Sequence, residues 1–120
     1  MRSGKFLNIL EKLDKKERKA FRAFLESPYP ASNMILLRLY DLITAAPNHQ
    51  APDHTDLWEQ LYKDEPEQRP YRDDHMRKHL SDLALLAEQF VTFEYVRQHP
   101  KRQEMVLLEF YRERGLDKYF

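Results

Sequence analysis

The sequence predicts an all-α protein, a compact bundle of about six helices in which the fifth helix is the longest and is central. Apolar residues recur at helical spacing through most of the chain. Among 120 residues there are two glycines, Gly4 and Gly115, whereas strands joined by tight turns usually need more. With 42% hydrophobic and 33% charged residues, a single helical domain with one modest core is expected over residues 1–120.

The first two expected helices follow each other closely. Ser3 can cap a helix that has a broad apolar side and runs to about Leu13. Asp14 and Glu17 have the spacing of a capping box, with Asp in place of Ser or Thr, and so start a second helix. Its apolar stripe consists of Phe21, Phe24 and Leu25. The two prolines of "SPYP" end it.

A third and a fourth helix come next. Ser32 or Asn33 can cap the third, which is apolar on most sides over residues 34–43 and is therefore expected near the centre. The proline-containing stretch "APNHQAPDH" is a loop. Asp53 or Thr55 caps a short fourth helix. The apolar residues of the fourth helix are Leu57, Trp58, Leu61 and Tyr62.

The fifth helix is expected from about Asp73 to Tyr95. Its apolar residues at helical spacing are Met76, Leu80, Leu83, Ala87, Phe90 and Val91. Pro100 suits the first position of a sixth helix, and Gly115 suits a left-handed stop after it. One buried cluster is expected to contain Phe21, Trp58, Leu83 and Phe90.

Composition excludes several classes of function. The absence of cysteine rules out disulfides, thiol nucleophiles and cysteine-ligated metals, and it is compatible with a cytoplasmic location. No apolar run approaches the roughly 20 residues of a membrane span, and the start of the chain does not look like a signal peptide. Neither a Gly-x-Ser-x-Gly elbow nor a glycine-rich phosphate loop occurs. We therefore expect no enzyme activity, no cofactor and no small-molecule substrate.

His75 and His79 lie four residues apart and so share a face of the fifth helix. A zinc-protease helix would place glutamate directly after the first histidine, where Met76 stands. Arg77 and Lys78 would also repel a cation. We predict that this pair binds no metal and forms the polar edge of the helix.

Two surfaces remain as candidates for contacts. The second helix is rich in basic residues, and those chosen as a candidate surface are Lys15, Lys16, Arg18, Lys19 and Arg22. They would suit phosphates or an acidic partner, although such charge runs are usually solvated helix faces. The second candidate surface, near the end of the sequence, consists of Leu107, Phe110, Tyr111, Tyr119 and Phe120. These side chains point in different directions around a helix, so part of the set is expected to be exposed and to meet either further helices or a second copy.

Three stretches, "LDKKERKAFRAFLESPY", "PYRDDHMRKHLSDLALLAEQF" and "LLEFYRERGLDKYF", resemble the N-terminal region of a family of uncharacterised, all-helical bacterial proteins. The resemblance implies a helical module that continues into helical repeats, and it carries no catalytic signature. Six short helices also fit death-fold-like interaction domains, although a fold does not fix a function.

The sequence thus favours a non-catalytic protein–protein interaction or scaffold module that is cytoplasmic, is the N-terminal part of a longer protein and can self-associate. The formal net charge of zero does not oppose self-association. The alternative is a nucleic-acid-binding domain that uses the basic second helix. A nucleic-acid binder usually has a basic excess, which this chain lacks.

Overall fold

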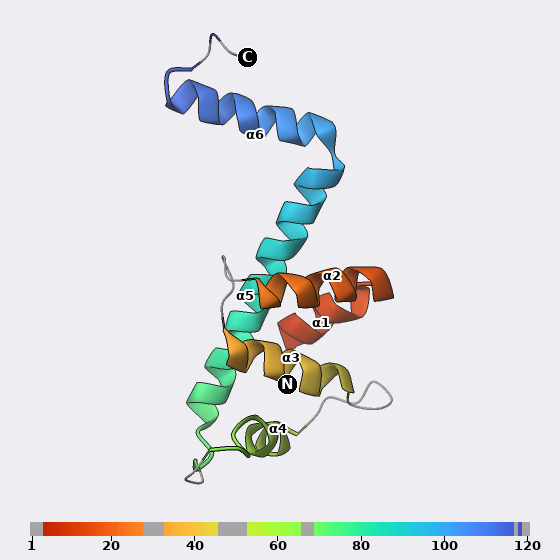
Figure 1. Cartoon of the computed structure of the whole chain (residues 1–120), viewed down its shortest axis with the longest axis vertical. Helices are drawn as coiled ribbons and strands as arrows, with labels where there is room; N and C mark the ends of the chain where they lie inside the picture. The colour runs from red at the N-terminus through yellow and green to blue at the C-terminus, as the bar shows by residue number, and fades with distance from the viewer. Residues whose placement is uncertain (1–3, 28–32, 46–52, 66–68, 117, 119–120) are drawn as a thin grey trace. The chain divides into compact units, whose positions relative to one another are not determined.

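The computed structural model describes residues 4–27, 33–45, 53–65, 69–116 and 118. These residues form α-helices and no strand (Figure 1). The helices are α1 (Gly4–Lys12), α2 (Lys15–Glu26), α3 (Met34–Ala45), α4 (His54–Leu61), α5 (Asp73–Gln98) and α6 (Pro100–Glu113). The predicted all-α class, the number of helices and the longest fifth helix, with 26 residues, are confirmed. None of the helices described combines the length and the apolar character that crossing a bilayer requires.

The chain divides into two compact units, Met1–Ala87 and Glu88–Phe120. The first unit contains α1 to α4 and the first part of α5, and the second contains the rest of α5 and α6. In the first unit α2 packs against α3, and α3 packs against α4. Within this unit α5 contributes more buried apolar side chains than any other helix, which confirms its central place. Those side chains are Met76, Leu80, Leu83, Ala84 and Ala87.

The core of the first unit includes an aromatic cluster built by three helices. Phe6 from α1, Phe21 from α2 and Tyr40 from α3 are all buried. The ring of Tyr40 meets Phe21 edge-on at 5.4 Å between centroids, and Phe6 lies 6.3 Å from Phe21. The buried Tyr40 hydroxyl donates a hydrogen bond to the carbonyl of Arg18 at 3.2 Å, so this polar group is satisfied. Phe21, Trp58 and Leu83 are buried as predicted, and Phe90 of the second unit is buried too, but the structure does not show the four in one cluster.

The helix starts follow the predicted local chemistry in two places. The Asp14 carboxylate accepts a hydrogen bond from the Glu17 amide at 2.8 Å, and the Glu17 carboxylate accepts one from the Asp14 amide at 2.9 Å. This reciprocal capping box fixes the start of α2. The Asn33 side chain accepts from the amides of Ile35 and Leu36 and so caps α3. The alternative cap Ser32, and Ser3 at the first helix, lie outside the described residues.

Arginines from neighbouring helices satisfy the ends of α1 and α4. Arg18 of α2 donates from both Nε and Nη2 to the carbonyl of Leu10, at 3.2 and 2.9 Å. Arg38 of α3 donates to the carbonyl of Leu61 at 2.8 Å. The last carbonyls of a helix have no partner within that helix, so these side chains also tie adjacent helices together.

In the second unit, α5 ends at Gln98, and His99 separates it from α6 with an extended backbone. Pro100 begins α6 as predicted, and Gly115 adopts a φ of 68° after its end. The ring of Tyr95 stacks on His99 at 3.9 Å between centroids, and the guanidinium of Arg102 lies 5.5 Å from the centre of the Tyr95 ring. These contacts join α6 to the end of α5 within this unit.

Candidate functional site

Three apolar side chains exposed on one face of α6 form the first candidate site. None of the residues of α6, which is described throughout, is buried. Val106 is 54% exposed, and Leu107 and Phe110 are both 45% exposed. Successive residues lie about 100° apart around a helix, so positions i, i+1 and i+4 share one face. We call Val106, Leu107 and Phe110 the α6 stripe.

The rest of α6 shows which side the stripe occupies. Leu108 and Tyr111 project on a neighbouring part of the helix surface and are half-buried. Met105 lies on nearly the opposite side from the stripe and is 60% exposed. The guanidinium of Arg114 lies 5.2 Å from the centre of the Phe110 ring, so the edge of the stripe is polar.

Sequence reasoning selected only part of this surface. It named Leu107 and Phe110, which are exposed, and Tyr111, which is half-buried; Tyr119 and Phe120 lie outside the described residues. It missed Val106. The signal that would have included Val106 is its i, i+1, i+4 spacing with Leu107 and Phe110.

The basic residues of α2 form the second candidate site, and two of the five have structural roles. Arg18 caps α1, as described above. Arg22 makes a bidentate pair with Asp41 of α3, at 2.8 Å for both contacts, and also pairs with Glu26. The hydrogen bond to Asp41 raises the pKa of Arg22 above its usual value. These two arginines therefore hold α2 against α1 and α3.

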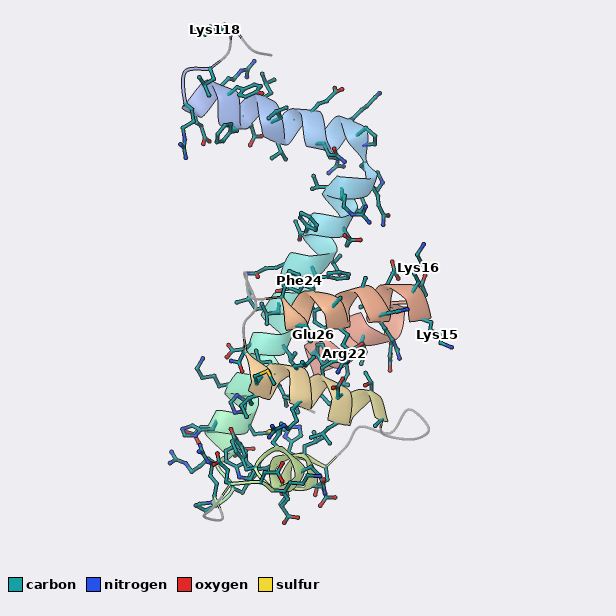
Figure 2. The ribbon with its side chains drawn as sticks, viewed as in Figure 1. Lys15, Lys16, Arg22, Phe24, Glu26 and Lys118 are labelled. Atoms are coloured by element: carbon teal, nitrogen blue, oxygen red, sulfur yellow. The ribbon has the colours of Figure 1, made fainter. Side chains whose placement is uncertain are left out.

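The lysines of α2 remain available for contacts. Figure 2 shows Lys15 and Lys16 at the start of α2, where they project away from the helices. Lys19 is exposed as well, and none of the three forms an ion pair with another described residue. Lys15 and Lys16 lie at the positive end of the helix dipole, which does not favour cations. Only three lysines of the predicted basic surface, Lys15, Lys16 and Lys19, therefore remain available for a partner.

His75 and His79 have different surroundings. The Nε2 of His79 and the hydroxyl of Tyr62 form a hydrogen bond of 2.9 Å, and the His79 ring stacks near Trp58. Burial lowers the pKa of His79 and so favours its neutral form. His75 is exposed beside Asp74. Among the described residues, no cluster of three or more His, Cys, Asp or Glu side chains could hold a metal ion.

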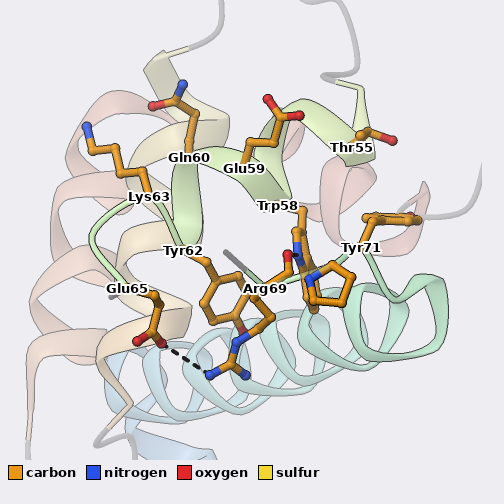
Figure 3. Close-up of a pocket in the computed structure, with 10 residues that line it drawn as sticks. Thr55, Trp58, Glu59, Gln60, Tyr62, Lys63, Glu65, Arg69 and Tyr71 are labelled. Atoms are coloured by element: carbon orange, nitrogen blue, oxygen red, sulfur yellow. Dashed lines mark hydrogen bonds and ion pairs between the residues drawn. The ribbon is translucent and has the colours of Figure 1, made fainter. Parts of the chain in front are cut away.

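A pocket of about 790 Å³ lies beside α4 and the segment that follows it (Figure 3). Trp58, Tyr62 and Tyr71 supply aromatic walls, and the guanidinium of Arg69 lies 4.5 Å from the centre of the Tyr62 ring. Arg69 also pairs with Glu65 at 3.2 Å, as the dashed line in Figure 3 marks. The sequence had not predicted this pocket, because its lining comes from two separate stretches, within residues 55–65 and 69–71.

Several of the polar groups that line this pocket already have partners within the chain. The Trp58 indole N–H donates to the carbonyl of Arg69 at 3.0 Å, and the Tyr71 hydroxyl donates to the Asp73 carboxylate at 2.8 Å. A binding pocket normally directs a few unpaired polar groups at its ligand. These contacts instead stabilise the loop against α4 and α5, so the pocket is the weaker candidate.

The chain matches no protein-family model, no curated protein and no solved structure. Its function therefore has to be inferred from its own side chains.

Proposed function

We propose that this chain is a non-catalytic protein–protein interaction module and that the α6 stripe is its contact surface. The observation that carries the proposal is the exposure of Val106, Leu107 and Phe110 on one face of α6. Contiguous exposed apolar side chains with polar edges are typical of contact sites. An amphipathic helix commonly binds a protein partner through such a face.

The contrast with α2 favours this surface over the basic one. Arg18 and Arg22 already have partners within the chain, whereas the stripe has apolar area left to bury. Binding to nucleic acid would rest on three lysines, Lys15, Lys16 and Lys19. Phosphate contacts by so few cations give weak binding that falls steeply with salt. A cytoplasmic location, supported by the absence of cysteine, belongs to the same proposal.

The test is a comparison of three full-length chains purified from the cells that express them: wild type, Phe110→Asp and Met105→Asp. Met105 is the matched control because it lies on the same helix, is exposed and faces away from the stripe. A protein that binds through the stripe should be retained by wild type and Met105→Asp and lost from Phe110→Asp. Titration of that purified protein should then show the same order of affinities.

Circular dichroism should show that both variants remain helical. If all three chains retain the same proteins with the same affinities, the stripe is not the contact surface. Binding lost equally from Phe110→Asp and Met105→Asp would indicate general damage to α6 and would also contradict the proposal.

A further inference from the structure

We infer that the α6 stripe binds the α6 stripe of a second copy of this chain, with the two helices antiparallel. The inference rests on the proposed function, since it names the partner of the same surface. It is carried by the charges along one edge of the stripe.

That edge is basic at one end and acidic at the other. Arg102, Glu109 and Glu113 lie at positions i, i+7 and i+11 and therefore share one side of α6, next to Val106. All three are exposed. None of them forms an ion pair with another residue that the structure describes. Glu109, Glu113 and Arg102, whose guanidinium also contacts the Tyr95 ring, thus stand beside an apolar face without an ion-pair partner among the described residues.

An antiparallel second copy would cover the apolar face and pair the two ends of the charged edge, at the cost of bringing Glu109 of one copy near Glu109 of the other. With Val106 opposite Phe110 of the second copy, Arg102 comes beside Glu113 of the second copy. The two-fold symmetry of such a pair repeats each contact, so the dimer would have two of these ion pairs. A parallel two-fold pair would instead carry this edge of each copy on opposite sides of the pair, so Arg102 would not meet Glu113, and it would align the helix dipoles unfavourably.

The chain as a whole does not oppose self-association. Its 20 basic and 20 acidic side chains give a formal net charge of zero, so two copies do not repel each other at long range. A helix of 14 residues is about 21 Å long, and two such helices bury less than a stable interface of roughly 1,200–2,000 Å². We therefore expect a weak, reversible dimer.

The experiment uses two charge-reversal variants of the full chain, Arg102→Glu and Glu113→Arg, studied by sedimentation equilibrium over a wide concentration range. Each variant alone places like charges together at both pairs of its own dimer. Dimerisation of each should weaken by about tenfold relative to wild type, given the usual strength of exposed ion pairs. In a 1:1 mixture, unlike charges face each other at both pairs of the mixed dimer, so association should return to the wild-type level.

The 1:1 mixture distinguishes a lost ion pair between chains from misfolding of one variant, because misfolding within one chain cannot be repaired by the other chain. Phe110→Asp should abolish the dimer, and Met105→Asp should leave it unchanged. A mixture that associates no better than its components overturns the antiparallel pairing. A wild-type chain that stays monomeric at every concentration overturns self-association, while the proposed function still stands if a different protein depends on Phe110.

Discussion

The helices α3 and α6 both contain several large apolar residues, but those of α3 are largely buried and those of α6 are largely exposed. Their charge content also differs, since α6 has six charged side chains among 14 residues and α3 has two among 12. In α3 the side chains of Leu36, Leu39, Tyr40 and Ile43 are buried, whereas α6 buries none. The difference in burial lies in the neighbours, because α3 has α2 on one side and α4 on the other. Apolar content indicates that a helix has a partner, and only the fold shows whether that partner lies within the same chain.

The polar residues of the two helices differ in the same way. On α3, Asp41 binds Arg22 and Arg38 binds the end of α4, so charges are used to hold neighbouring helices. On α6, Arg102 and Glu113 have no ion-pair partner among the described residues. The charged side chains of α3 thus hold neighbouring helices, whereas Arg102 and Glu113 on one edge of α6 form no ion pair with another described residue.

The largest loss of stability is expected from a substitution in the buried face of α3. Leu39 is fully buried, so Leu39→Ala removes apolar contacts and leaves a cavity. We expect the free energy of unfolding of the first unit to fall by about 2–5 kcal/mol. Urea denaturation followed by the fluorescence of Trp58, the single tryptophan, measures this unit directly. A change below about 1 kcal/mol would show that α3 is not a core helix.

A smaller effect is expected at the helix starts. Asp14→Ala removes the side-chain half of the capping box of α2 and should lower stability by about 1 kcal/mol. His99, at the equivalent position of α6, makes no side-chain capping bond. His99→Ala removes no capping bond, so it should change the unfolding curve less than Asp14→Ala does when unfolding is monitored by circular dichroism, which reports on both units. Equal losses from the two variants would mean that the capping box contributes nothing particular to α2.

The pH dependence of the free energy of unfolding should reveal the contribution of His79. Its pKa in the folded chain lies below the ordinary value of 6.5, so the unfolded chain binds this proton more readily. Stability from the neutral, hydrogen-bonded ring is fully present well above about pH 6.5 and is lost as the pH falls from there through the lower pKa of the folded chain. His79→Gln should therefore lose less stability than wild type between about pH 7 and about pH 5. Urea denaturation monitored by circular dichroism at several pH values tests this. Identical pH profiles of stability for wild type and His79→Gln would contradict it.

The smallest loss of stability is expected from a substitution in α6, and it provides a direct comparison with α3. Leu107 is the same residue type as Leu39 and is 45% exposed. Leu107→Ala should change the free energy of unfolding by no more than about 0.5 kcal/mol, as is usual at a surface. The measurement is made at low protein concentration so that self-association does not contribute. A loss as large as that of Leu39→Ala would show that the stripe is buried within a single chain.

Local sequence rules predicted much of this fold. The capping box at Asp14, the cap at Asn33, the start of α6 at Pro100 and the left-handed Gly115 all depend on a few neighbouring residues. The end of α5 was placed three residues too early, at Tyr95. Proline restricts the residue before it, so His99 is extended and the helix continues to Gln98.

The partners of the basic residues could not be predicted in this way. Asp41 is 19 positions from Arg22, and no local pattern links them. For the same reason the pocket beside Trp58 was not expected, since no local pattern links its lining residues in 55–65 with those in 69–71. At α6, helical spacing predicts which side chains share a face, but it does not reveal whether that face is covered.

The contact between Arg18 and Leu10 has a consequence for the order of folding. It joins residues only eight positions apart, across the short connection between α1 and α2. Closing so short a loop costs little chain entropy, and local contacts speed folding. The α1–α2 hairpin can therefore form before the distant Asp41 reaches Arg22. In this order of folding, the Arg18–Leu10 contact first brings Phe6 and Phe21 together. Helix α3 then packs Tyr40 against these two rings.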